Sequence, residues 1–461
     1  MDQTQNKMGT QKMVPLIFSM ALPAMISMLI SALYNIVDSI FVAKYSQDAL
    51  TAVSLVFPLQ QLVIAIAVGT GVGVNSLIAR RLGARMQSEA DSAARHGVAL
   101  SVVSGIVFIF IGFFLSRPFL AAFTNRASIL EQAVQYSHIA VGLSIFVMIS
   151  IMCEKIQQAT GNMIIPMVQG LTGAIFNIIL DPLMIFGIGP FPEMGIRGAA
   201  IATVIGQVFG MFVGIWGAFF HQKVVDVHMR GFRWEGAAVR EIYRVGLPGI
   251  VMQSISSVMV SVMNLILITF SEVAVAVLGI YFKLQTFVFM PVFGLNQGAL
   301  PVMAFNYGAH NRHRLMSAYR VSLIAAFVIM IAGLVAFQVL PEPMLMLFAD
   351  TNDAAATATL LELGTPALRI ISLSFPCAAF GIITSTLFQS VGRGVASLLV
   401  SVARQLFAIL PAAWLLGKLY GLPEIWFSFP IAEVIAVILS TVLLYHAYHT
   451  ELRFLETPKE G

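Results

Sequence analysis

Two acidic residues stand in the middle of long apolar segments, where a charge is costly. Asp38 occurs in LYNIVDSIFV and Asp181 in FNIILDPLMIFG. An ionised carboxylate at the centre of a membrane-spanning helix costs about 2.5 to 3.5 kcal/mol, so each position calls for a chemical explanation. A carboxyl group removed from water takes up a proton more readily, and two carboxylates with amide oxygens can instead hold a monovalent cation. Either event would neutralise the site.

Other polar residues recur at helical spacing around these acids. Tyr34 and Asn35 precede Asp38 by four and three positions, and Asn177 precedes Asp181 by four. Residues at this spacing share one face of a helix, so each group would project from a single face toward the interior of a bundle. The alternative is that the two acids only form hydrogen bonds to neighbouring helices. The sequence leaves both interpretations open.

The composition identifies the environment of these segments. Of 461 residues, 58% are hydrophobic and 10% are charged, whereas soluble domains average about 25% charged residues. The chain is therefore expected in a lipid bilayer. A net charge of +4 is too small and too dispersed to indicate a nucleic-acid partner. Cys153 and Cys377 lie far apart in apolar runs, which excludes a disulfide framework and a zinc motif.

The chain contains twelve apolar stretches long enough to cross a bilayer as helices, which need roughly 20 residues each. The long continuous runs favour helices over the short alternating segments of a β-barrel. We therefore expect an all-α membrane protein whose first stretch is a retained helix and not a signal peptide. The predicted spans are 14–43, 51–79, 96–117, 133–156, 162–187, 195–220, 245–270, 273–302, 317–340, 363–388, 396–417 and 424–447.

Basic residues in the short loops predict the orientation. With the amino terminus in the cytoplasm, 18 of the 26 Lys and Arg residues lie on the cytoplasmic side, among them Arg80, Arg81 and Lys459. This distribution follows the positive-inside rule. Both termini are therefore expected in the cytoplasm.

The sequence repeats itself once. A shift of 225 residues aligns the two halves of the chain, and a shift of 231 aligns their later parts, with Gln158 on Gln389 and Gly161 on Gly392. We expect two six-helix lobes, 1–225 and 226–461, with parallel topology and a cleft between them. The first shift pairs Pro23 with Pro248, Gln60 with Gln285, Gly69 with Gly294, Gly73 with Gly298 and Gly83 with Gly308.

The repeat also serves as a control for the two acids. Asp38 aligns with Met263 and Asp181 aligns with Ala412, so neither acid has a counterpart in the second lobe. A residue that the shared fold requires should occur in both copies. The asymmetry therefore favours a chemical task for the first lobe.

Further residues in the spans are weaker candidates. Pro23 removes one helical hydrogen bond and permits a bend in the first span, although Pro248 at the matching place makes a bend required by the fold the simpler explanation. Glu433 and Arg404 are second-lobe charges that could pair with each other or touch a substrate.

Glu154 and Lys155 lie where the fourth span meets the cytoplasm, and we expect them to be solvated.

The sequence lacks the motifs of ATP-driven transporters and of hydrolases. No Walker A loop and no G-x-S-x-G motif occurs, so the sequence predicts neither an enzyme nor ATP hydrolysis. Transport would then be driven by an ion gradient.

Four segments together resemble a known family of transporters. They are ALP followed by LYNIVDSIFVA in the first span, GARMQSEA after the second, QATG at 158–161 and NIILDP in the fifth. These motifs and the six-plus-six duplication are similar to the multidrug and toxic compound extrusion (MATE) transporters, in particular to a prokaryotic branch similar to DinF. The resemblance implies a V-shaped pair of lobes.

The resemblance also implies roles for particular residues. Asp38, Asn177 and Asp181 would form the first-lobe ion site, with Tyr34, Asn35 and Thr203 in its polar network and Pro23 at the bending point. The family's sodium-using members carry further acids in spans seven and ten. Span seven here offers Gln253 and Asn264, which with Glu433 remain candidates for the substrate cavity.

The expected function is export of amphipathic or cationic compounds in exchange for H⁺ or Na⁺. No other cofactor is expected, and the expected setting is a bacterial inner membrane, with the chain acting as a monomer. Two alternatives are a flippase for lipid-linked precursors, which would need a more basic cleft, and a membrane scaffold that transports nothing.

Overall fold

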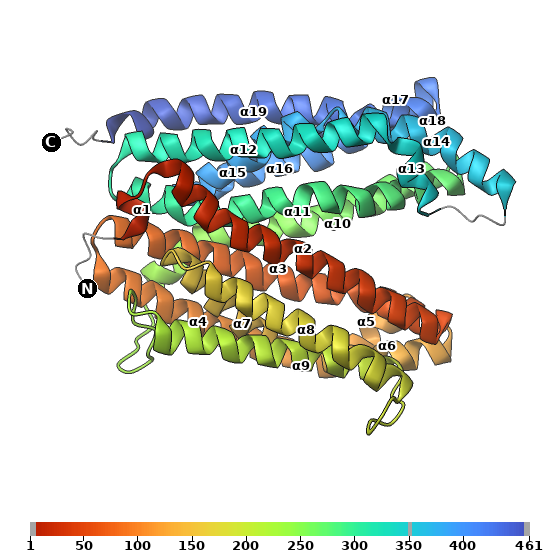
Figure 1. Ribbon diagram of the computed structural model, residues 1–461, viewed down its shortest axis with the longest axis horizontal. Coiled ribbons are helices and arrows are strands. Elements are labelled where there is room, and N and C mark those ends of the chain that lie inside the picture. The colour runs from red at the N-terminus through yellow and green to blue at the C-terminus, as the bar shows by residue number, and fades with distance from the viewer. Residues whose placement is uncertain (1–5, 349–352, 456–461) are drawn as a thin grey trace.

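The computed structural model describes residues 6–348 and 353–455, and Lys459 lies outside this part of the chain. The described residues form helices and no strands, which confirms the all-α prediction (Figure 1). Large apolar side chains are exposed along the outer faces of many helices, as with Phe110, Phe220 and Phe407. Faces of this kind suit contact with lipid chains.

The first lobe contains the helices up to residue 221. It begins with a short helix, α1, ahead of the first span, and π-helical turns extend α4 and α9. The elements are α1 (Lys7–Thr10), α2 (Met13–Tyr45), α3 (Gln47–Gly83), α4 (Gln87–Phe110), η2 (Ile111–Leu115), α5 (Ser116–Ala121), α6 (Ala127–Ala140), α7 (Ile145–Ala159), α8 (Ile164–Phe186), α9 (Ile196–Ile215) and η3 (Trp216–His221).

The second lobe repeats this order after a linker. The π-helix η4 interrupts the fifth span of this lobe, which is the eleventh of the chain, and a 3-10 turn follows the last helix. The elements are α10 (Gly236–Ile268), α11 (Glu272–Gly308), α12 (Arg312–Val339), α13 (Pro341–Met346), α14 (Ala354–Ser372), α15 (Phe375–Ser390), α16 (Gly394–Val402), η4 (Ala403–Ile409), α17 (Leu410–Tyr420), α18 (Leu422–Ile425), α19 (Ser428–Thr450) and η5 (Leu452–Phe454).

Within residues 6–348 and 353–455, ten helices are long and apolar enough to cross a membrane on their own, and the number of spans reaches the expected twelve if each of two bent pairs is one span. The bent pairs are α6 with α7, at 43°, and α14 with α15, at 46°. They replace the straight spans predicted at 133–156 and 363–388, and both are the fourth span of their lobe. In the first lobe the bend lies where Gly142 packs against Gly112 without room for a Cβ atom on either residue.

Glycines of the repeat hold the two lobes together in a symmetric way. A Cβ atom on Gly83 would lie 1.9 Å from the carbonyl oxygen of Phe305, and one on Gly308 would lie 1.9 Å from that of Arg80. The shift of 225 residues converts the first contact into the second. Gly69 and Gly294 exchange partners in the same way, against Ile250 and Met25. The interface is therefore pseudo-two-fold, and its backbones meet where only glycine fits.

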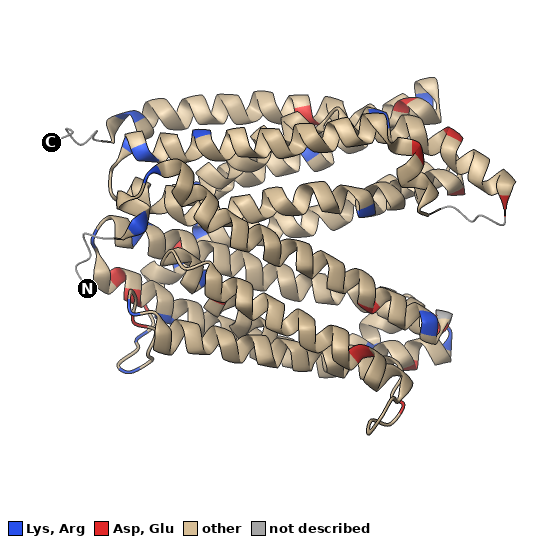
Figure 2. Cartoon of the chain, viewed as in Figure 1, with Lys and Arg blue, Asp and Glu red and all other residues tan. Residues whose placement is uncertain are grey.

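The helices of both lobes run along the same direction, and both termini lie at one end of the molecule, which we call the terminal end (Figure 1). The ribbons of the two lobes lie close together there and diverge toward the opposite end. Lys and Arg residues gather at the ends of the helices and are sparse along their middle (Figure 2). This distribution suits a chain whose middle section faces lipid.

Candidate functional site

The two intramembrane acids meet inside the first lobe. The carboxyl groups of Asp38 of α2 and Asp181 of α8 lie close enough to interact directly with each other. Two ionised carboxylates at close range repel each other and have no donor between them, so a proton or a cation would stabilise this arrangement. Asp181 is 0% exposed, and Asp38 is partly exposed.

Asn177 connects the acids to a third helix. Its Nδ2 atom donates to Thr203 Oγ1 of α9 at 3.1 Å and to Asp181 Oδ1 at 3.3 Å. Asn177 is 3% exposed. The amide reaches the hydroxyl because α8 and α9 approach closely at Gly173 and Gly206, where a Cβ atom on Gly206 would lie 2.6 Å from the Gly173 carbonyl oxygen.

Three oxygen atoms of this group lack a hydrogen-bond donor among the described residues. They are Asp38 Oδ1, Asp181 Oδ2 and Asn177 Oδ1, and each is buried. An unpartnered buried oxygen is costly unless a ligand or a proton satisfies it. Oxygen atoms of these types are ligands that hard cations prefer. The group therefore has the chemistry of a site for H⁺ or for a monovalent cation.

Two tyrosine side chains, those of Tyr34 and Tyr136, also belong to this group. Tyr136 was not among the residues predicted from the sequence. Tyr34 of α2 and Tyr136 of α6 lie close enough to both carboxyl groups to interact electrostatically with them. Gln60 of α3 donates through Nε2 to Tyr136 Oη at 3.4 Å. Tyr136 lies 98 residues from Asp38 in a different span, so no spacing rule links it to the acids. Its polar group in an apolar span was the available signal.

Other predicted residues lie apart from this group. Asn35 is exposed and donates to the carbonyl oxygen of Ser31 at 2.8 Å, one turn earlier in the same helix. Gln253 is exposed and Asn264 is half-buried, both on α10 of the second lobe. Helix α2 passes through Pro23 without interruption, and α10 does the same at Pro248.

Glu433 forms an ion pair within the second lobe. Arg404 Nη1 of η4 donates to Glu433 Oε1 of α19 at 2.8 Å. Glu433 is 8% exposed, and its second oxygen, Oε2, has no donor among the described residues. The π-helical turn brings Arg404 onto the α19 side of its span. Of the two interpretations left open by the sequence, pairing with Arg404 is the one the structure contains.

The expectation that Lys155 is solvated is wrong. Its side chain is buried and its Nζ atom contacts three polar side chains, one of which, Gln297, belongs to the second lobe. The prediction failed because α11 covers the end of α7, and a span boundary in the sequence does not reveal a neighbouring helix.

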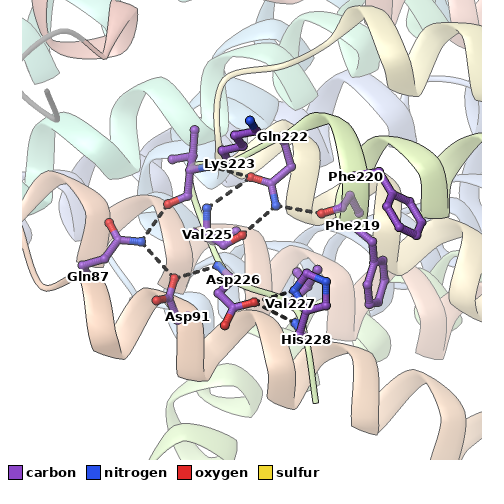
Figure 3. A pocket seen from close by; sticks show the side chains of 12 residues that line it. Gln87, Asp91, Phe219, Phe220, Gln222, Lys223, Val225, Asp226, Val227 and His228 are labelled. Carbon is purple, nitrogen blue, oxygen red and sulfur yellow. Dashed lines mark hydrogen bonds and ion pairs between the residues drawn. The ribbon is translucent and has the colours of Figure 1, made fainter. Parts of the chain in front are cut away.

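The linker between the lobes forms a separate pocket of about 370 Å³ with α4 (Figure 3). Gln222 folds the linker by accepting from the backbone N–H of Val224 and Val225. Asp91 of α4 accepts from the Asp226 backbone N–H at 2.9 Å. These bonds tie the linker to the first lobe. The amide and carboxylate groups of Gln87, Asp91, Gln222 and Asp226 bond to other groups of this pocket, which indicates a structural role (Figure 3).

Known proteins resemble this chain along almost its whole length. The MatE family model matches twice, at residues 23–183 and 248–415, so the two matches start at Pro23 and Pro248. A Multidrug export protein MepA from Staphylococcus haemolyticus is 26% identical over 429 residues, covering 92% of each chain. A protein of the same name from Staphylococcus aureus strain MSSA476 is 25% identical over 427 residues, again covering 92% of each.

Solved structures agree with this assignment. A MOP superfamily transporter from Pyrococcus furiosus superposes with a TM-score of 0.90 at 27% identity, covering 97% of this chain and 98% of that one. An outward-facing multidrug resistance MATE family transporter has a TM-score of 0.89 at 27% identity and covers 96% and 99%. The repeated family match and the shared fold show that this chain belongs to the MatE family, and it is therefore a multi-pass membrane transporter and not an enzyme.

Proposed function

We propose that this transporter is a secondary active antiporter that exports amphipathic or cationic compounds in exchange for H⁺ or Na⁺. The contact between Asp38 and Asp181 is the observation that carries the proposal. A site that needs a proton or a cation to hold two carboxyl groups together can respond to an ion gradient. The relatives named as multidrug export proteins support the substrate class.

The coupling ion acts on the packing of α2 against α8. With the ion bound, the two acids share its positive charge, their mutual repulsion is relieved and the helices stay together. When the ion leaves, the carboxylates repel each other, and α2 is free to repack. The Asn177 bridge to Thr203 transmits this change to α9. Pro23 gives α2 one missing backbone hydrogen bond at which it can bend.

Alternating access follows from the relation of the two lobes. Basic residues favour a cytoplasmic location for the terminal end, in the inner membrane of a bacterium. The lobes are packed together at that end, which makes this the outward-facing arrangement (Figure 1). Ion uptake from outside would then drive the return of the lobes. One charge crossing 100 mV supplies about 2.3 kcal/mol, in addition to any concentration gradient.

The composition supports a cavity that accepts varied compounds. The chain has 24 Met and 34 Phe residues, and methionine is flexible and polarisable enough to adapt to different apolar ligands. We propose that a single chain performs the cycle, because the ion site and both lobes belong to one polypeptide.

Proteoliposome efflux of a fluorescent cation tests the proposal. Vesicles with an imposed pH gradient are compared with vesicles that carry a sodium gradient at constant pH. We expect one gradient to drive efflux and Asp38→Asn to reduce it to the leak rate of empty vesicles. Full gradient-driven efflux by the variant would refute ion coupling at the acids. Movement of a labelled polyprenyl-linked lipid without efflux of the cation would indicate a flippase, and movement of neither would indicate a scaffold.

A further inference from the structure

Hydrogen bonds cross between the lobes near the terminal end. Arg81 of α3 donates through Nη2 to both carboxylate oxygens of Glu241 on α10, at 2.8 and 2.9 Å. Ser76 Oγ of α3 donates to the carbonyl oxygen of Gln389 on α15 at 2.7 Å. These bonds join first-lobe helices to second-lobe helices, so opening the terminal end has to break them.

A buried charged contact between the lobes centres on Lys155. This residue is 4% exposed, and its Nζ atom donates to Glu154 Oε1 at 2.9 Å, to Gln158 Oε1 at 3.0 Å and to Gln297 Oε1 of the second lobe at 2.8 Å. The carbon stem of Lys155 fills the space beside Gly71, where a Cβ atom would lie 2.6 Å from Lys155 Cγ. All three donors of the ammonium group are therefore used.

Gln158 reinforces the same link between lobes. Its Nε2 atom donates to Glu154 Oε1 at 2.8 Å and to Gln297 Oε1 at 3.0 Å. The oxygen of Gln297 thus accepts two hydrogen bonds from α7, one of them from a charged donor. Charge-assisted hydrogen bonds are the stronger kind, particularly where water is excluded.

The internal repeat shows that the fold does not require this lysine. Under the shift of 231 residues, Lys155 aligns with Thr386. Thr386 Oγ1 donates to Asn296 Oδ1 at 2.6 Å, and both residues belong to the second lobe. The matching position therefore bonds within its own lobe, whereas Lys155 bonds across the interface. As with Asp38 and Asp181, the charge occurs in one lobe only.

We propose that Lys155, Glu154, Gln158 and Gln297 form an interlobe lock that holds the terminal end closed. Separation of the lobes removes Gln297 from the ammonium group and exposes the remaining bonds to water. The lock thus sets how easily the transporter leaves the arrangement described here. This inference rests on the proposed alternation between two open ends.

Two spans connect the surroundings of Asp38 and Asp181 to the lock. Helix α6 carries Tyr136 beside the acids, and α7, the other half of that bent span, carries Lys155. Helix α3 carries Gln60 next to Tyr136 and Gly71 next to the lysine stem. A change of packing at the acids therefore has a direct structural route to the lock.

Alkylation of a buried interface cysteine tests the lock. Ser76 is 0% exposed, so S76C reacts with a polar maleimide only when the terminal end opens. The background carries C153A and C377A, and the protein is held in nanodiscs so that both ends are accessible. We expect K155M and Q297L to raise the alkylation rate about tenfold or more, because a hydrogen bond to a charged group is removed. Q297E should lower the rate, since a carboxylate attracts the ammonium more strongly.

T386V is the matched control, because it removes the corresponding hydrogen bond within one lobe and should leave the rate unchanged. An unchanged or lower rate for K155M, or an equal rise for T386V, overturns the lock. Ion-driven efflux of the C153A/C377A parent, which keeps the Ser76 bond to Gln389, is measured in parallel. Normal efflux of the parent with unaltered alkylation of the K155M variant refutes the lock alone, whereas loss of gradient dependence in the parent refutes the proposed antiport.

Discussion

Asp38 and Asp181 lie 143 positions apart in the sequence, yet their carboxyl groups lie close enough to interact directly between α2 and α8. Their repeat counterparts, Met263 and Ala412, are apolar, so the second lobe has the same helices without the acids. The two lobes therefore have similar bundles of helices, and only the first lobe carries the two acids. This asymmetry is the basis of the first two predictions.

Replacement of either acid by its amide should uncouple transport from the ion gradient. Asp181→Asn keeps the shape of the side chain and removes its negative charge, so efflux should fall to the leak rate in the proteoliposome assay. The matched control is Asn35→Ala on α2, whose side chain bonds only to Ser31 of its own helix among the partners observed. Equal losses from both variants would contradict a specific role for the acids.

Thr203 should tune the affinity for the coupling ion without being essential. Thr203→Val keeps the volume of the side chain but removes the acceptor of the Asn177 amide. One hydrogen bond contributes about 0.5 to 1.5 kcal/mol, so the ion concentration at half-maximal efflux should change by up to about tenfold. The maximal rate should remain near that of the unaltered protein. A complete loss of efflux would show that Thr203 is an obligatory ligand.

The symmetric glycine contacts should be equally intolerant of a methyl group. Gly83→Ala and Gly308→Ala place Cβ against a backbone carbonyl, which cannot move aside as a side chain can. We expect each to lower stability by about 3 kcal/mol or more, visible as a lower Tm in detergent. Gly279→Ala on α11 meets no atom within 4 Å and should leave Tm unchanged or slightly raised. Tolerance at only one of the two paired glycines would contradict the pseudo-two-fold interface.

The Arg404–Glu433 pair should contribute to stability and not to coupling. Glu433→Gln leaves a partly buried guanidinium without its counter-charge and should cost about 1 to 3 kcal/mol. The double variant R404M/E433M should recover much of this loss, because neither charge then remains buried. Tm and efflux per folded protein are the two measurements. Selective loss of efflux for cationic compounds at unchanged Tm would instead assign Glu433 to the substrate cavity.

Asp226 should hold the linker at all ordinary pH values. Hydrogen bonds from the backbone and ring of His228, together with the contact to Arg95, lower the pKa of Asp226 from 3.8 to about 2. Since the folded state favours the ionised form, the stabilisation is complete above about pH 4 and is lost as pH falls through about 2.

Amide hydrogen exchange of residues 222–235 measures this effect. Asp226→Asn should accelerate exchange by about two- to fivefold at pH 7, the range expected for an exposed ion pair. Exchange in the unaltered protein, corrected for its intrinsic pH dependence, should be constant between pH 5 and 8. A step within that range would assign the linker's stability to another group.

The sequence by itself determined the class of protein, the twelve spans, the duplication and the acids. Continuous apolar runs leave few alternatives to membrane helices, and a charge among them is visible in one dimension. The same reasoning found Asn177 by its spacing from Asp181. It also paired the glycines whose symmetric contacts the structure contains, since each pair occurs at one fixed shift.

Only the tertiary structure decided which polar residues meet. Tyr136 lies close to the two acids, and the side chain of Asn35 bonds to its own helix. Lys155 is buried and bonds to Gln297, although it lies near the end of a span. The bends between α6 and α7 and between α14 and α15 were likewise absent from the prediction. The physical reason is that hydropathy records how a segment partitions into lipid, whereas the neighbour of each side chain depends on how helices distant in sequence pack together.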